Sequence, residues 1–182
     1  MGAALVAATV AIIALLGGYR ITGSGSLSGL LARVGPSLHS AVWEELAFRG
    51  LLFRWLATWR GGAWAMAVSA AVFGGLHGLL ENGSTWSAVA VAVEAGVLLS
   101  TAYWATGDLW LPIGTHFGWN LTLGGVFGSA VSGRAVPSVF AAELSGPAWL
   151  TGGAFGLEAS VPAVVVCLVA AAALWKLRSA SP

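Results

Sequence analysis

The stretch AVWEELAFRGLLFRWLA, residues Ala41 to Ala57, sets charged side chains inside a segment that is otherwise apolar enough to cross a membrane. Two adjacent glutamates, Glu44 and Glu45, are followed by Arg49 and Arg54. A charge near the middle of a bilayer costs about 3 kcal/mol even on the mildest scale, so such residues usually face the interior of a helical bundle and mark a functional site. The stretch therefore predicts a membrane helix that carries part of a polar site.

The composition also indicates a membrane protein. Of the 182 residues, 58% are hydrophobic and 8% are charged, and the mean hydropathy is +0.86. Because one span needs about 20 apolar residues, we expect an all-α fold: a single membrane domain over residues 1–182, with about six transmembrane helices around a polar intramembrane cavity. The net charge of +1 excludes nucleic acid as a partner, which would need a basic surface.

Six apolar runs are candidate spans, and each ends at Gly, Pro or a charged residue. Their approximate bounds are 2–19, 40–58, 63–80, 86–105, 109–129 and 157–177. Two long connections, 20–39 and 130–156, are rich in Gly and Ser. We expect loops there, the first with a short interfacial helix at LSGLLARV and the second either a flexible lid or an idle loop. Basic residues divide evenly between the two sides, so the positive-inside rule gives no orientation.

The spacing within the second run separates its two glutamates. Glu45 and Arg49 are four residues apart, which brings them onto one helical face as an ion pair. Glu44 points about 100° away and has no cation three or four residues distant. Glu44 is therefore the carboxylate predicted to be free for chemistry, unless both glutamates share Arg49 in a structural network.

Two further runs contribute polar side chains. FGGLH carries Phe73 and His77 one turn apart, and HFGWN carries His116 and Asn120 one turn apart. Each pair alone is as well explained by hydrogen bonding within a core. Together with Glu44 they form a set able to activate water and stabilise an oxyanion. Counting turns along antiparallel spans predicts Glu44 and His77 at similar depth, with His116 and Asn120 some turns deeper.

The three motifs resemble those of a known family. EELAFR, FGGLH and HFGWN are similar, in order, to the EExxxR, FxxxH and HxxxN motifs of the CAAX protease and bacteriocin-processing family, also called CPBP or Abi. The flanking LWLPIGTHFGWN and the late GGAFGLEAS also resemble that family, so the likeness covers about residues 40–177. It implies a glutamic intramembrane endopeptidase that needs no metal and cleaves a membrane-associated peptide or protein precursor.

The resemblance assigns roles to the motif residues. By similarity, Glu44 and His77 activate the attacking water, and His116 and Asn120 stabilise the tetrahedral oxyanion. The supporting residues it implies are Glu45, Arg49 and Phe73. The chain has one predicted span before the glutamate helix, unlike the eight-helix eukaryotic CAAX-processing enzyme, so specificity for prenylated substrates is not implied.

Three other functions fit the same residues. Glu44, His77 and His116 would make a His2Glu zinc site with water as the fourth ligand, although no HExxH pair is present. A non-catalytic membrane immunity or scaffold protein, or a proton-coupled transporter, would also use intramembrane carboxylates. Glu94 lies in an apolar run outside all three motifs, and we expect it to have a structural partner. High Ala, Gly, Val and Arg with a single Lys favours a bacterial cell membrane as the location.

Overall fold

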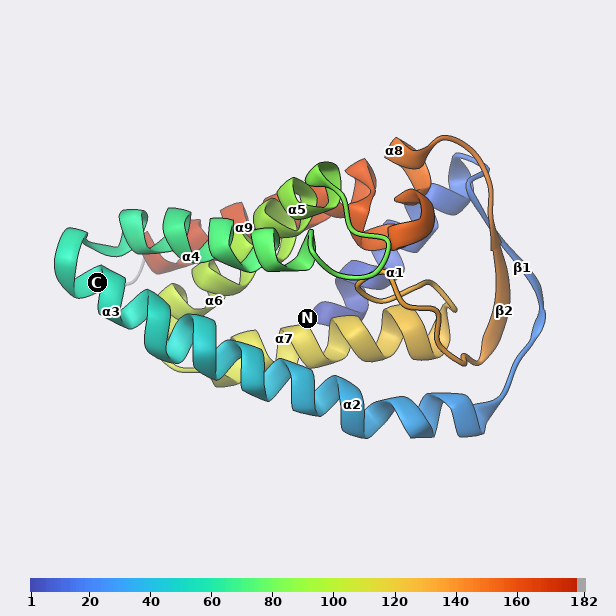
Figure 1. Ribbon diagram of the computed structural model, residues 1–182, viewed down its shortest axis with the longest axis horizontal. Coiled ribbons are helices and arrows are strands. Elements are labelled where there is room, and N and C mark those ends of the chain that lie inside the picture. The colour runs from blue at the N-terminus through green and yellow to red at the C-terminus, as the bar shows by residue number, and fades with distance from the viewer. Residues whose placement is uncertain (180–182) are drawn as a thin grey trace.

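The computed structural model describes residues 1–179, and most of them are helical (Figure 1). The chain begins with α1 (Gly2–Leu15). A long helix follows, made of α2 (Leu27–Glu45), a π-helical segment (Leu46–Phe53) and α3 (Arg54–Arg60). The remaining long helices, in order, are α4 (Gly62–His77), α5 (Thr85–Val91) running through a π-helical segment (Ala92–Val97) into α6 (Leu98–Thr106), α7 (Trp110–Asn120) with its π-helical end (Leu121–Val126), and α9 (Val161–Ser179).

The glutamate helix begins much earlier than predicted. It starts at Leu27, where the side chain of the N-cap residue Ser26 accepts a hydrogen bond from the amide of Ser28. LSGLLARV is therefore the first part of a long helix, and no separate interfacial helix precedes residue 40. Pro36 lies inside this helix. Gly, Ser and Pro lower helix propensity locally and so predicted a loop, whereas packing against neighbouring helices maintains the helix.

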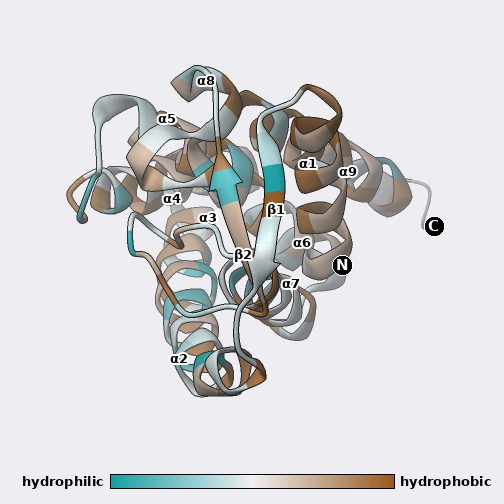
Figure 2. Cartoon of the chain, turned by 90° about the vertical axis from the view of Figure 1, so that its right-hand side faces the viewer, coloured by the Kyte–Doolittle hydropathy of each residue, from teal (hydrophilic) through white to brown (hydrophobic). Residues whose placement is uncertain are grey.

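The two long connections meet in a β-ribbon, a feature absent from the predicted all-α fold. Strand β1 (Tyr19–Ser24) pairs antiparallel with β2 (Phe140–Leu144), so that Tyr19 faces Leu144 and Ser24 faces Phe140. The ribbon lies at one end of the helical bundle (Figures 1 and 2). It also shortens the first span, which ends at Leu15. Between β2 and α9 lie α8 (Ala148–Thr151) and two 3₁₀ turns, Gly153–Phe155 and Leu157–Ala159.

The helices pack closely where small residues face each other. Gly74 of α4 lies so near the α5 helix that a Cβ atom there would fall 2.2 Å from the carbonyl oxygen of Ala88. The neighbouring Gly75 has open space around it. Close backbone approach at small residues is characteristic of helix packing in membranes, and here it fixes the position of the helix that ends at His77.

The number of spans differs from the prediction. Within the described part of the chain, the continuous helix Thr85–Thr106 is the one that is both long and apolar enough to cross a membrane. The other apolar helices are shorter: Gly2–Leu15, Gly62–His77 and Val161–Leu177. The expected count of six spans is therefore not confirmed, although most of the predicted apolar runs do form helices.

Candidate active site

A buried ion pair fixes the glutamate helix, as its spacing predicts. Arg49 Nη1 donates to Glu45 Oε1 at 3.0 Å, and both side chains have no exposed surface. Arg49 Nη2 also donates to the carbonyl oxygens of Ala95 and Gly96, each at 3.1 Å. These carbonyls belong to the π-helical segment between α5 and α6. Arg49 therefore joins two helices, and within residues 1–179 it makes no hydrogen bond to Glu44.

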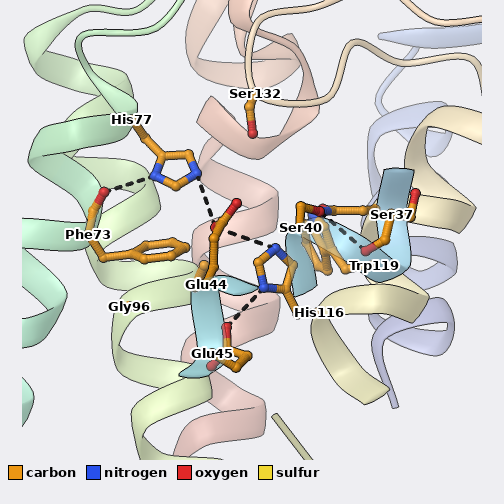
Figure 3. Close-up of polar contacts among 12 residues, drawn as sticks. Ser37, Ser40, Glu44, Glu45, Phe73, His77, Gly96, His116, Trp119 and Ser132 are labelled. Atoms are coloured by element: carbon orange, nitrogen blue, oxygen red, sulfur yellow. Dashed lines mark hydrogen bonds and ion pairs between the residues drawn. The ribbon is translucent and has the colours of Figure 1, made fainter. Parts of the chain in front are cut away.

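Glu44 faces the two histidines instead. Its Oε2 atom lies 4.0 Å from His77 Nε2 and 3.9 Å from His116 Nε2 (Figure 3). About a quarter of the Glu44 side chain is exposed (24%), whereas Glu45 is fully enclosed. Two consecutive carboxylates thus occupy different settings, because a step of one residue turns the helix by about 100°.

Hydrogen bonds at Nδ1 orient both imidazole rings. His77 Nδ1 lies 2.8 Å from the carbonyl oxygen of Phe73, and His116 Nδ1 lies 2.9 Å from Glu45 Oε1. A carbonyl oxygen or a carboxylate accepts hydrogen bonds, so in each ring the proton is assigned to Nδ1. The Phe73 ring also stacks on His77, with centroids 4.4 Å apart and the planes inclined by 34°. Both rings therefore turn Nε2 toward Glu44.

His116 lies at the level of Glu44, which corrects the depth expected from the sequence. Its distance to Glu44 is nearly the same as that of His77. The expected depth was counted from a helix beginning near residue 40. Since the helix begins at Leu27, Glu44 lies midway along it and reaches the level of the third motif.

Asn120 contacts the same helix one turn earlier. Its Nδ2 donates to Ser40 Oγ at 3.2 Å, and Ser40 in turn donates to the carbonyl oxygen of Ser37. The side chain of Asn120 is almost fully buried. Sequence reasoning missed Ser40, although its spacing of four residues from Glu44 places both on one helical face.

A cleft of about 330 Å³ gives access to these residues. It is lined by Glu44, His77, His116, Asn120 and Ser40, with Arg33, Arg134 and several apolar side chains around them. Behind the histidines lies a smaller cavity of about 30 Å³, which has room for about one water molecule.

Glu94 faces this inner cavity. The side chain is 2% exposed, and its Oε2 atom is buried without a hydrogen-bond partner among the described residues. The expected structural partner is therefore missing for this oxygen. Arg54, another cation of the glutamate helix, lies along a different pocket between α2 and α7.

Glu158 is a buried carboxylate that sequence reasoning did not single out. Its Oε1 accepts from Trp119 Nε1 at 3.2 Å, and its Oε2 accepts from the backbone amide of Ser132 at 2.6 Å. Trp119 lies between His116 and Asn120 in the third motif. The feature of the sequence that could have identified Glu158 is that it is the single acidic residue in GGAFGLEAS, a stretch otherwise made of apolar and small residues.

No set of three or more His, Cys, Asp or Glu side chains is arranged to hold a metal ion anywhere in residues 1–179. The residues proposed from the sequence as zinc ligands, Glu44, His77 and His116, do lie together, with Nε2 to Oε2 separations of 3.9 and 4.0 Å.

Comparison with known proteins identifies the family to which the chain belongs. A family model described as type II CAAX prenyl endopeptidase, Rce1-like, matches residues 26–122, which is more than half of the chain and contains all three motifs. No curated protein and no solved structure matches the chain. The helical fold and this match define an integral membrane hydrolase of the CAAX protease type. The chain belongs to the type II CAAX prenyl endopeptidase Rce1-like family, within the CPBP proteases.

Proposed function

We propose that the protein is a glutamic intramembrane endopeptidase that hydrolyses one peptide bond in a membrane-associated peptide or protein precursor. The observation that carries this proposal is the convergence of His77 Nε2 and His116 Nε2 on Glu44 Oε2, at 4.0 and 3.9 Å. These separations are too long for direct hydrogen bonds. They suit groups that share a bound water, because a polar contact beyond about 3.5 Å is commonly bridged by one.

In the proposed reaction, Glu44 and His77 hold and activate the attacking water. The water oxygen bonds to the scissile carbonyl carbon while Glu44 takes a proton from it. His77 accepts a hydrogen bond at Nε2, since its Nδ1 proton is directed to the Phe73 carbonyl. When the C–N bond breaks, Glu44 passes its proton to the leaving amine. The products are a carboxylate and an amine.

His116 and Asn120 would stabilise the oxyanion. In its imidazolium form, His116 donates from Nε2 to the developing charge, while Nδ1–H donates to Glu45. Asn120 has a second amide proton besides the one directed to Ser40. Removing one preorganised donor of this kind costs about 10²–10³ in kcat. Glu45 and Arg49 would fix the geometry, because their buried pair ties the glutamate helix to the backbone of the α5–α6 helix.

The first test compares purified wild-type protein with Glu44→Gln and His77→Ala in detergent, on quenched peptides that carry a membrane anchor. We expect cleavage by the wild type and a fall in kcat of at least about 10²-fold in each variant, the usual contribution of a positioned base. Cleavage that survives Glu44→Gln would remove Glu44 from the role of base. Biological activity in the cell that survives the same substitution would instead favour a non-catalytic protein.

The same assay with a chelator addresses the metal. We propose that no metal takes part, so chelation should leave the rate unchanged. A rate that is lost on chelation and restored by zinc would instead assign Glu44, His77 and His116 as ligands of a catalytic zinc.

A matched panel would define the substrate. Each peptide is presented with an apolar helical anchor and, in parallel, with an isoprenoid or acyl chain on a cysteine. We propose a peptide or protein precursor in a bacterial cell membrane, which predicts cleavage of the helix-anchored set. Cleavage confined to the isoprenoid set would contradict that assignment and favour prenylated substrates.

A further inference from the structure

A tight hairpin covers the cleft beside Glu44. The backbone amides of Val131 and Arg134 each donate to the other residue's carbonyl oxygen at 3.0 Å, leaving a two-residue turn between them. Both turn residues have positive φ, 50° at Ser132 and 80° at Gly133. A glycine or asparagine is usual in the first of these positions. A serine there costs about 1–2 kcal/mol of local strain.

Three other segments hold this hairpin in place. The Gly133 amide donates to the Phe155 carbonyl at 3.0 Å, and the Gly133 carbonyl accepts from Asn82 Nδ2 at 2.8 Å. The third contact is the short bond from the Ser132 amide to Glu158 Oε2, at 2.6 Å. Glu158 is buried and is also held by Trp119. The strained backbone of Ser132 is therefore fixed by Glu158, whose carboxylate also accepts a hydrogen bond from Trp119 of the third motif.

The Ser132 side chain points into the site. It lines both the cleft that contains Glu44 and the inner cavity. Figure 3 shows its hydroxyl directed toward Glu44 and His77. Within residues 1–179, this hydroxyl donates no hydrogen bond. Strained positions of this kind collect at ligand-binding sites, where the surrounding structure maintains them.

We propose that Ser132 is a substrate-binding residue whose hydroxyl donates a hydrogen bond to a backbone carbonyl of the bound peptide next to the scissile bond. Glu158 is then a positioning residue, which acts by holding the Ser132 amide. The proposal rests on the endopeptidase function proposed above. Neither residue lies within the matched region 26–122, so both add to what family membership implies.

The test uses Ser132→Gly, because glycine removes the hydroxyl and also relieves the positive φ. If Ser132 had only a structural role, this substitution would leave the stability of the protein unchanged or raise it, and kcat and KM would not change. We expect the thermal unfolding midpoint to stay the same or rise, KM to increase about tenfold, and kcat to change less than threefold. That pattern corresponds to the loss of one hydrogen bond made equally to the bound substrate and the transition state. Ser138→Ala is the matched control, since its hydroxyl bonds the Phe140 carbonyl away from the cleft.

A second pair of variants tests the role of Glu158. Glu158→Gln keeps the shape, but its amide nitrogen cannot accept from a second N–H group. We expect a several-fold rise in KM in the wild-type background and little further rise in the Ser132→Gly background, because residues that act through one another are not additive. Equal effects in both backgrounds would show that Glu158 does not act through Ser132.

The outcomes separate this proposal from the one it rests on. Wild-type cleavage that Glu44→Gln abolishes and Ser132→Gly leaves at the wild-type KM would overturn the substrate contact alone. A fall in kcat without a change in KM would also overturn it, since the hydroxyl would then act only in the transition state. Failure of the wild type to cleave any peptide in the panel would overturn both proposals.

Discussion

At the scale of single residues, position on the helix gives two neighbouring glutamates different environments. Glu45 is enclosed and bonded to Arg49 and His116, whereas Glu44 is partly exposed and faces two imidazole rings. Removing one member of a buried ion pair leaves the other charge uncompensated, which costs about 3–5 kcal/mol. Glu45 therefore has the stabilising contacts, whereas the adjacent Glu44 is left facing the cleft.

The same substitution at both positions should separate these roles. Glu45→Gln leaves the Arg49 charge buried and unbalanced, so we expect a fall of several degrees in the midpoint of thermal unfolding in detergent. Glu44→Gln should leave that midpoint unchanged while removing activity. An equal loss of stability in the two variants would show that both glutamates belong to one structural network, the alternative considered from the sequence.

Local spacing predicted the residue-level contacts that lie within one helix. The Glu45–Arg49 pair and the Phe73–His77 contact both follow from a four-residue step. Contacts between helices could not be derived in this way. The bonds of Asn120 to Ser40 and of Ser132 to Glu158 depend on how distant segments pack, and a single sequence does not contain that information.

At the scale of the element, wide helical turns occur beside the site. The π-helical segments begin directly after Glu45 and after Asn120, and the third contains Glu94. Turns of this kind are frequent at functional sites, because they rotate the following side chains relative to a regular helix. Close packing of α4 against α5 supplies the other constraint on the site.

Two adjacent glycines in the FGGLH motif provide a matched test of that packing. A Cβ at Gly74 would lie 2.2 Å from the Ala88 carbonyl oxygen, so Gly74→Ala should force α4 away from α5, destabilise the protein by about 1–3 kcal/mol and displace His77. Gly75→Ala meets nothing within 4 Å and should stabilise the helix by about 0.5–1 kcal/mol.

Thermal unfolding and kcat of the two variants check this prediction. If Gly75→Ala lost as much stability or activity as Gly74→Ala, close approach of α4 and α5 would not explain the position of His77.

Predictions of the helices succeeded where apolar runs were long and uninterrupted. The run over residues 86–105 corresponds to the helix Thr85–Thr106, and the run over 63–80 to α4. The prediction was wrong at the glutamate helix, because Gly35 and Pro36 marked a loop where the helix continues. Local propensity was overridden there by the helices that α2 packs against, α7 and its π-helical end.

At the scale of the whole molecule, the β-ribbon ties the two long connections together at one end of the helical bundle. The exposed pair Arg20 and Glu143 lies across it at 2.6 Å, and an exposed pair of this kind adds little stability. The Tyr19 hydroxyl adds a bond to the Phe127 carbonyl at 2.8 Å. The Val131–Arg134 hairpin, which lines the cleft, is held by three further hydrogen bonds. The hairpin and the ribbon together therefore fix the segment 131–144 in place.

A reversible cross-link across the ribbon tests whether this segment must move away from the cleft during turnover. Arg20→Cys with Glu143→Cys places two thiols opposite each other on the exposed face of the ribbon, while the native Cys167 is buried. We expect the oxidised protein to keep at least half of the activity of its reduced form. Activity that disappears on oxidation and returns with reductant would show that the strands separate during turnover, as expected of a flexible lid.

The ribbon and Glu158 also impose an order on synthesis. The motif residues from Glu44 to Asn120 emerge from the ribosome before β2, and the carboxylate that fixes the Ser132 hairpin follows later still. Because β1 must wait for a partner more than a hundred residues downstream, the ribbon is a late, non-local contact in folding. The growing chain would thus hold its polar motif residues in the membrane before the ribbon exists, and a nascent chain arrested before residue 140 would lack both β2 and the carboxylate that fixes the hairpin.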